Sequence, residues 1–302
     1  MVGEPMKTRL WGPRRHAIVL AALLMAAACG TSGPSAAPSD SAVEGAFALR
    51  AKLNQAIPPE ARFTWLPYLL ITADGTVVRQ GPVPAIFPGP LLPNLQGAPL
   101  SDAGYDRIVE RAGALGLLEG SGDFVPAGMP LGGQTGSVEL LVNGELRTIT
   151  GDPNRIIQCI TTPCDPEPGT AEAFGTFWAE LGDLGSLVGS ELGQDTAYHP
   201  DGFALLIGVE PPDDGGLGRQ VVTWPLETPL ADIGQPVGNT LLPRCGTVAG
   251  EDAATLEAAF AAANQLTMWV DQGRDPADAA SIAVRPVLPG EDPCQELFGV
   301  ES

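Results

Sequence analysis

The chain has 302 residues, with 16 Lys and Arg against 36 Asp and Glu, which gives a formal net charge of -20. This excess of acids excludes a nucleic-acid binder that depends on clustered basic residues for phosphate contacts. Hydrophobic residues make up 44% of the chain, enough for a sizeable core, so general disorder is also excluded. Glycine and proline together reach about 22%, which predicts a globular protein rich in loops.

The first 28 residues have the pattern of a secretory signal peptide. A basic segment precedes an uninterrupted apolar run over residues 17–28. The basic residues are Lys7, Arg9, Arg14 and Arg15. A run of this length is too short for a permanent transmembrane helix, but it fits the apolar region of a signal peptide.

Small residues lead directly from this run to a cysteine, in the sequence Ala26-Ala27-Ala28-Cys29-Gly30. The stretch resembles the lipobox of bacterial lipoproteins, although Ala26 stands where the family usually has Leu. The resemblance implies that the Cys29 thiol is acylated with diacylglycerol and becomes the new N-terminus. The protein is then expected on the outer face of the cytoplasmic membrane. The alternative is ordinary signal cleavage, with Cys29 as a bystander.

Removal of the signal peptide makes the chain more acidic. Residues 29–302 hold 12 basic and 35 acidic residues, a net charge of -23, with Lys52 as the only lysine. Anionic lipids repel such a surface, so membrane attachment would depend on the lipid, and a cationic partner is favoured over an anionic one. Residues 29–45 are mostly small and include proline, which predicts a flexible tether.

One strand and two hairpins are predicted in the first half of the folded part. Apolar residues at alternate positions indicate a half-buried strand over 47–53. The hairpins span 68–78 and 137–150. They turn at Asp74-Gly75 and Asn143-Gly144, dipeptides that favour the positive φ of tight turns.

Three helices are predicted from apolar residues at helical spacing, over 101–115, 171–188 and 251–269. Ser101 can cap the first helix, and Gly116 can supply the left-handed residue at its end. Further strands are predicted over 203–209, 219–224 and 281–284, the last one stopped by Pro286.

These elements predict an α+β fold in which antiparallel hairpins pack with three main helices. The order lacks the regular βαβ alternation that would indicate a parallel sheet. One interpretation divides the chain into two lobes, residues 46–195 and 196–302. The other interpretation is one continuous domain.

Four cysteines follow Cys29, and an even number in an exported chain indicates two disulfides with three possible pairings. They are Cys159, Cys164, Cys245 and Cys294. We favour a local clip between Cys159 and Cys164, and a long loop closed by Cys245 and Cys294. A metal site is disfavoured, because there is no C-x-x-C motif and one histidine, His199, remains after the signal.

No catalytic residue is identified from the sequence, and no metal or cofactor is expected. His199 lies in a predicted turn, and neither a G-x-S-x-G nor an S-x-x-K motif is present. The glycine-rich stretch 131–136 lacks the lysine of a phosphate loop, and the acidic turn 213–216 lacks the ligand spacing of an EF-hand. Paired carboxylates remain an alternative, since so many acids guarantee chance pairs.

The segment 82–99 is a candidate recognition loop. Its six prolines forbid a regular helix or a central strand. The loop nevertheless carries the apolar residues Ile86, Phe87, Leu91 and Leu92. It either covers part of the core or presents a preorganised recognition surface, which loses little entropy on binding.

Two stretches resemble a family of secreted or lipid-anchored proteins of high-GC Gram-positive bacteria that has no assigned activity. They are residues 66–96 (LPYLLITADGTVVRQGPVPAIFPGPLLPNLQ) and 244–270 (RCGTVAGEDAATLEAAFAAANQLTMWV), the latter followed by VRPVLPGEDPC at 284–294. The resemblance spans most of residues 46–298 and implies an envelope location, but it supplies no catalytic residues. In the family pattern the C-terminal cysteines flank the helix and the strand, which agrees with pairing Cys245 and Cys294.

The sequence therefore predicts a non-enzymatic, lipid-anchored binding domain whose partner is an envelope protein or a cationic ligand, not a nucleic acid. One alternative is an extracytoplasmic hydrolase that uses carboxylates. Another is an inhibitor-like module that acts through the loop between Cys159 and Cys164. Two buried carboxylates in one pocket would favour the hydrolase, whereas an apolar surface rimmed by prolines would favour binding.

Overall fold

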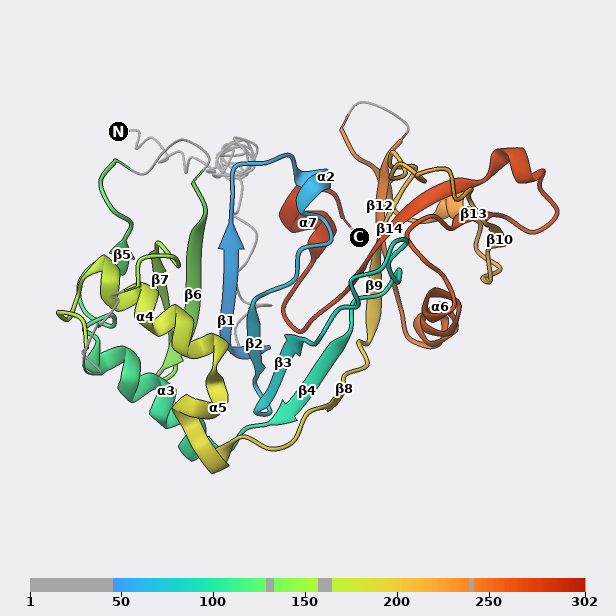
Figure 1. Ribbon diagram of the computed structural model, residues 1–302. Helices are drawn as coiled ribbons and strands as arrows, with labels where there is room; N and C mark the ends of the chain where they lie inside the picture. Colours follow the sequence, from blue (N-terminus) through green and yellow to red (C-terminus); the bar gives the residue numbers. More distant parts are fainter. Residues whose placement is uncertain (1–45, 129–132, 157–164, 239–241, 302) are drawn as a thin grey trace, which may run out of the picture. The chain divides into compact units, whose positions relative to one another are not determined.

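Two β-sheets, each with helices packed against it, form the folded part of the computed structural model (Figure 1). The structure describes residues 46–128, 133–156, 165–238 and 242–301. These residues belong to one compact unit, Ala42–Ser302. The predicted signal peptide, Cys29 and the tether lie outside the described residues, and so do Cys159 and Cys164.

The first sheet is built mainly from the first half of the chain. Its strands are β1 (Phe47–Asn54), β2 (Leu69–Thr72), β3 (Thr76–Gln80), β4 (Leu95–Pro99), β5 (Asp123–Phe124), β6 (Thr135–Val142), β7 (Glu145–Gly151) and β8 (Thr196–Ala197). The order is β5-β7-β6-β1-β2-β3-β4-β8, antiparallel except for the pair β5–β7. Both predicted hairpins are confirmed, as β2–β3 and β6–β7. The second turn has positive φ at Asn143 and Gly144, whereas the first has it at Gly75 alone.

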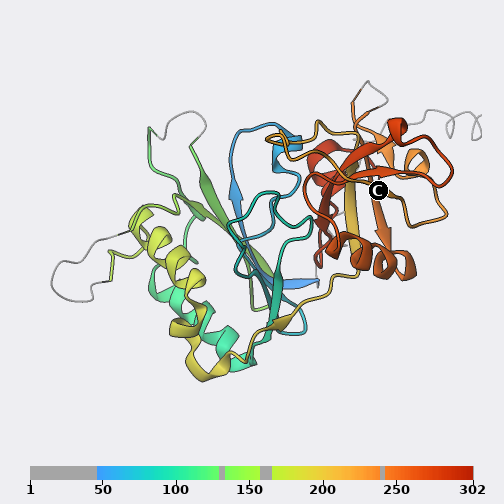
Figure 2. The ribbon, with the colours of Figure 1, turned by 45° about the vertical axis from the view of Figure 1, so that its right-hand side comes forward.

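Helices α3 (Asp102–Ala114), α4 (Ala171–Gly182) and α5 (Leu184–Val188) cover one face of this sheet (Figures 1 and 2). The predicted cap of the first helix is confirmed, because the Ser101 hydroxyl accepts a hydrogen bond of 3.1 Å from the Gly104 amide. The single helix predicted over 171–188 is wrong, since the chain leaves helical geometry at Asp183. At this break a Cβ on Gly182 would overlap the hydroxyl of Tyr68, so packing against Tyr68 requires glycine.

The second sheet comes from the last hundred residues. Its strands are β9 (Gly202–Ile207), β10 (Val221–Thr223), β11 (Gln235–Pro236), β12 (Arg244–Ala249), β13 (Met268–Val270) and β14 (Ala280–Pro286). The order is β10-β13-β14-β9-β12-β11, antiparallel except for β10–β13. Helix α6 (Glu251–Ala261) packs on one face of this sheet. There the rings of Phe260 and Trp269 meet edge to face, with their centres 5.5 Å apart.

The prediction of one helix over 251–269 is wrong. Helix α6 ends at Ala261, and residues 268–270 form β13 instead. Between them Asn264 closes a turn, because its side chain accepts from the Leu266 amide at 2.8 Å and its own amide donates to the Thr267 hydroxyl at 3.1 Å. Pairing of β13 with both β10 and β14 outweighs the helical spacing of this segment.

Each half of the chain also covers the opposite face of the other half's sheet. Phe63 follows the short helix α2 (Pro59–Arg62) and packs against Leu206 of the second sheet. The centre of its ring lies 6.2 Å from that of Phe298 in α7 (Pro293–Phe298). Conversely, Leu288 packs with Leu70 and Val78 of the first sheet. Short segments of each half therefore pack on the sheet of the other half. These segments have no helical or strand-like spacing of apolar residues that would have predicted the contact.

The predicted disulfide between Cys245 and Cys294 is confirmed and joins β12 to α7. Both cysteines are fully buried. The bond closes a loop with a sequence separation of 49 residues, and on the chain-entropy estimate such a loop stabilises the fold by about 4 kcal/mol. It is the one disulfide in the part of the chain that the structure describes, where the sequence predicts two for the whole chain.

Strand β1 confirms the predicted strand, but its predicted polar face is more buried than expected, because Arg50 is buried and only Ala48 and Lys52 are partly exposed. A shift of register between Phe47 and Leu49 breaks the period of two and places these side chains in different clusters. Arg50, expected on a polar face, is buried and lies 4.5 Å from the centre of the Phe47 ring. Its Nε pairs with Oε2 of Glu139 at 2.6 Å.

A buried ion pair fixes the end of β14. Nη2 of Arg285 lies 2.7 Å from Oε1 of Glu291, and their side chains are 7% and 0% exposed. Nη1 of Arg285 also donates to the carbonyl oxygen of Phe63 at 3.5 Å. Burial raises the pKa of Glu291, while the charge of Arg285 opposes this shift. The pair thus links β14, α2 and the segment before α7.

We expect Glu291→Ala to lower the free energy of unfolding by about 3–5 kcal/mol, because it leaves Arg285 buried without a carboxylate. Urea denaturation followed by circular dichroism measures the change. The double variant Arg285→Met/Glu291→Leu should recover most of the loss, since it removes both charges. The control Glu145→Ala breaks an exposed pair with Arg147 and should cost less than about 1 kcal/mol. Equal effects of Glu291→Ala and the control would contradict the assigned role of the pair.

Candidate functional site

The predicted recognition loop forms one wall of a groove of about 490 Å³, which we call the proline groove. The opposite wall and floor come from residues 209–212 and from β14. Five prolines line it: Pro84, Pro90, Pro93, Pro211 and Pro212. Its volume falls within the range of about 300–1,000 Å³ that is typical of ligand sites. The site therefore combines a loop that the sequence singles out with a strand far from it in the chain.

The loop has an exposed tip and a partly buried base. Ile86 and Phe87 are 64% and 52% exposed, whereas Leu91 and Leu92 pack against the core beneath α6. Both interpretations of the loop thus describe a part of it, since the base covers the core and the tip offers apolar surface. An exposed aromatic beside an exposed isoleucine is the kind of patch that marks interaction sites.

Backbone hydrogen bonds hold the base in place. The Gln265 amide donates to the Gly89 carbonyl at 3.1 Å, and the Leu91 amide donates to the Ala263 carbonyl at 3.3 Å. At the neck of the loop, the Gly81 amide donates to the carbonyl of Asn94 at 2.7 Å. The exposed tip is therefore carried on a base that is hydrogen-bonded to the turn after α6.

The floor of the groove is a strand edge. The Gly208 amide donates to the Ser281 carbonyl, and the Val287 amide donates to the Gly202 carbonyl. In the register of β14 with β9, every second residue from Ser281 onward is therefore hydrogen-bonded to β9. Val284 falls between these pairs and directs its N–H and C=O away from β9. On that side β13 pairs only with Ala280 and Ser281, and Val284 has no strand partner among the described residues. Val284 is 3% exposed, which places this edge at the bottom of the groove.

Few polar side chains face the groove. Glu210 is the single carboxylate among its described lining residues, and Gln80, Gln265, Thr64 and Ser281 are neutral. The carboxylates of the neighbouring acidic turn bind their own backbone. Asp213 and Asp214 each accept a hydrogen bond from the amide two residues later, at 3.0 and 2.9 Å. The groove is thus apolar and weakly negative.

His199, the histidine weighed as a catalytic base, lies on the surface. Its side chain is largely exposed, and Nδ1 lies 2.6 Å from Oε1 of Glu257. A solvated pair of this kind holds a turn against α6 and lacks the enclosed environment of a catalytic base. Across the described ranges, no three His, Cys, Asp or Glu side chains are grouped so that they could hold a metal ion.

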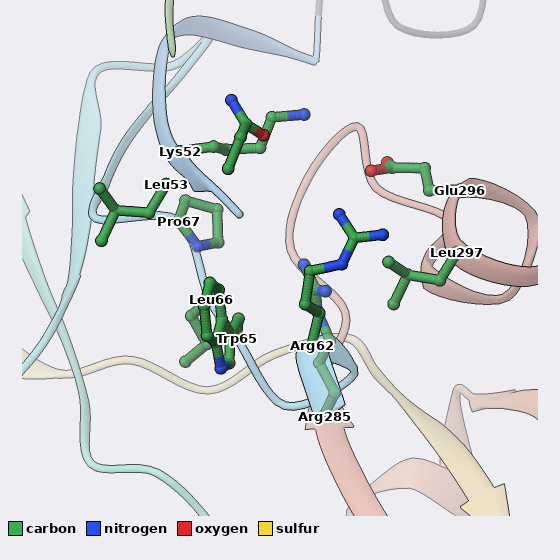
Figure 3. Close-up of a pocket in the computed structure, with 10 residues that line it drawn as sticks. Lys52, Leu53, Arg62, Trp65, Leu66, Pro67, Arg285, Glu296 and Leu297 are labelled. Carbon is green, nitrogen blue, oxygen red and sulfur yellow. The ribbon is translucent and has the colours of Figure 1, made fainter. Parts of the chain in front are cut away.

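A second, smaller pocket of about 140 Å³ lies where β1, α2, β14 and α7 meet (Figure 3). We call it the basic pocket, because three cationic side chains line it: Lys52, Arg62 and Arg285. In the view of Figure 3, Lys52 lies to one side of the pocket and Glu296 to the other, and Arg62 and Arg285 lie between them. No motif in the sequence predicts this site. A charged residue within an apolar strand, such as Arg285 in residues 281–286, was the signal that could have indicated it.

No protein-family model, no curated protein and no solved structure matches this chain. Within the described ranges, none of the helices combines the length and the apolar character needed to cross a membrane. The described fold and sites define a mixed α and β domain with an apolar groove and a small basic pocket.

The loop tip and the loop base should respond differently to truncation. We expect Phe87→Ala to change the free energy of unfolding by no more than about 0.5 kcal/mol, because the ring is half exposed. Leu92→Ala should lower it by about 1–2 kcal/mol, a part of the cost for a fully buried leucine. Urea denaturation of both variants measures the difference. A larger loss for Phe87→Ala than for Leu92→Ala would show that the tip belongs to the core.

Proposed function

We propose that the protein is a lipid-anchored, extracytoplasmic binding protein without catalytic activity, and that its proline groove takes an extended segment of another envelope protein. The observation that carries the proposal is the exposed pair Ile86 and Phe87, held beside an apolar groove with an open strand edge at its floor. An apolar tip on a hydrogen-bonded base suits recognition, because little entropy is lost when the partner binds.

The floor of the groove favours an extended partner. The backbone N–H and C=O of Val284 are a donor and an acceptor in an otherwise apolar groove, and an extended backbone presents the matching groups. Alternate side chains of such a segment would then face the apolar walls, which include Ile86, and could reach the exposed ring of the next residue, Phe87. An aromatic side chain at the centre of a contact commonly contributes a large share of the binding energy.

Charge favours basic residues in the partner. Glu210 lines the groove, and residues 29–302 carry a formal charge of -23. A field of this sign speeds the approach of cationic partners and repels anionic ones. The hydrolase alternative receives less support, since glycoside cleavage needs two carboxylates across the bond and Glu210 has no second carboxylate among the described residues that line the groove.

Export and anchoring are proposed from the N-terminal sequence. The basic segment, the apolar run over 17–28 and the small residues before Cys29 together support cleavage at Cys29 and attachment by a lipid. Residues 66–96 and 244–294 support membership in the secreted or lipid-anchored family of high-GC Gram-positive bacteria. An exported chain also supports a second disulfide, between Cys159 and Cys164.

The groove proposal is tested by panning a library of linear peptides against the purified protein. We expect selected peptides to alternate apolar residues and to carry Lys or Arg. Phe87→Ser should weaken their binding at least about tenfold, as for an aromatic hot spot, and peptide binding should slow hydrogen exchange at the Val284 amide.

The matched control is Leu146→Ser, which changes an exposed apolar residue on β7 of the first sheet. It should leave peptide affinity unchanged. Peptides that bind Phe87→Ser as tightly as the wild type, or that leave exchange at Val284 unaffected, would sink the groove proposal.

Intact-mass spectrometry of the mature protein tests both covalent proposals. We expect a chain that begins at Cys29 with the added mass of a lipid, and no alkylation of Cys159 or Cys164 without prior reduction. Cys29→Ala should release the protein into the culture medium, because the mature surface is too acidic to adhere to anionic lipids. Retention of this variant at the membrane would refute the lipid anchor, and alkylation of the unreduced protein would refute the second disulfide.

A further inference from the structure

We propose that the basic pocket binds the carboxylate of a small organic monoanion with a short apolar tail. This inference is independent of the proline groove, since the two sites share no lining residue. Its donors come from three elements or their ends: Lys52 and Asn54 of β1, Arg62 of α2 and Arg285 of β14.

Arg62 differs from most arginines of the described chain. Most of them pair with a carboxylate within 4 Å: Arg50, Arg79, Arg107, Arg111, Arg147, Arg155 and Arg285. Arg62 has no ion pair with any described residue, and its Nε is buried without a hydrogen-bond partner. Residues 29–302 hold 35 acids and 12 basic residues, so a half-buried cation that has neither an acid nor a hydrogen-bond partner for its buried Nε points to an external anion.

The charges around the pocket leave an excess of one positive charge. Arg50 and Lys52 share Oε2 of Glu139, at 2.6 and 3.8 Å, and Arg285 pairs with Glu291. Glu296 lies 3.8 Å from Arg50. Four cations, with Arg62 as the fourth, therefore face three carboxylates. One negative charge is therefore needed to balance the pocket.

A second cation in the pocket has an unused donor. The side chain of Arg285 is only 7% exposed, and its Nε is buried without a hydrogen-bond partner. Arg62 and Arg285 both line this pocket, so two like charges face one half-enclosed space. Guanidinium groups bind carboxylates through parallel hydrogen bonds, and an oxyanion between the two would offset their repulsion.

The remaining walls define the rest of the ligand. Leu53, Trp65, Leu66, Pro67 and Leu297 give the pocket an apolar side. Its 140 Å³ holds only a few non-hydrogen atoms, given that one water occupies about 30 Å³ in the liquid. An excess of one charge matches a monocarboxylate better than a phosphate dianion. The carboxylate can come from a free short-chain acid or from the C-terminus of a peptide, and the two sources are separable by experiment.

Isothermal titration of the purified protein with four probes tests this assignment: isobutyrate, N-acetyl-Ala-Leu, the amide of that dipeptide, and inorganic phosphate. We expect a carboxylate to bind, with phosphate at least about tenfold weaker and the amide not bound, and we expect affinity to fall with added salt. Tighter binding of isobutyrate assigns a free acid, and tighter binding of the dipeptide assigns a chain end.

Arg62→Gln should weaken carboxylate binding by about ten- to a hundred-fold while leaving the urea midpoint unchanged, because the side chain has no partner to lose. Lys52→Gln is the second variant and should weaken binding as well. Arg274→Gln, at an exposed arginine that forms no ion pair with the described residues, is the matched control and should bind like the wild type. Absence of carboxylate binding at about 10 mM, tighter binding of phosphate, or unchanged affinity in Arg62→Gln would each overturn the proposal.

Discussion

The buried ion pair between Arg285 and Glu291 is the interaction on which the arrangement of this chain depends. One guanidinium meets the carboxylate of Glu291 at 2.7 Å and donates to the carbonyl of Phe63, so that β14, α2 and the segment before α7 converge on it. An unpaired charge at so buried a position is costly, and displacement of either partner is disfavoured. The disulfide between Cys245 and Cys294 holds α7 against β12 nearby, and together these links keep each half of the chain on the other half's sheet.

Strand β14 connects this constraint to both candidate sites. Its edge at Val284 forms the floor of the proline groove, and the next residue, Arg285, projects into the basic pocket. The groove meets the backbone edge of β14, whereas the pocket meets a side chain on one of its faces, so a single strand can serve two separate sites. The acidity of the chain also has two consequences. It favours a cationic partner for the groove, and it makes the unpaired Arg62 of the basic pocket conspicuous.

Sequence patterns predicted the elements whose causes are local. The turn at Asn143-Gly144, the Ser101 cap and the apolar loop with Ile86 and Phe87 were all predictable, because each depends on residues within a few positions of one another. The helix predicted over 171–188 failed where Gly182 meets Tyr68, a contact across more than a hundred residues. The basic pocket was not predictable for the same reason, since its cations come from distant parts of the chain.

The sequence by itself determined the charge, the turns, the caps and the stiff apolar loop, because composition and backbone preference act over short distances. It also carried the cysteine pair that closes β12 onto α7, since cysteine number and order limit the pairings. Only the tertiary structure decided that Arg50 of β1 is buried, that residues 268–270 form a strand, and that Arg62 and Arg285 line one pocket. These outcomes depend on which distant segments meet. The free energy gained by burial and by strand pairing between such segments exceeds the small preference of any single residue for a helix or a strand.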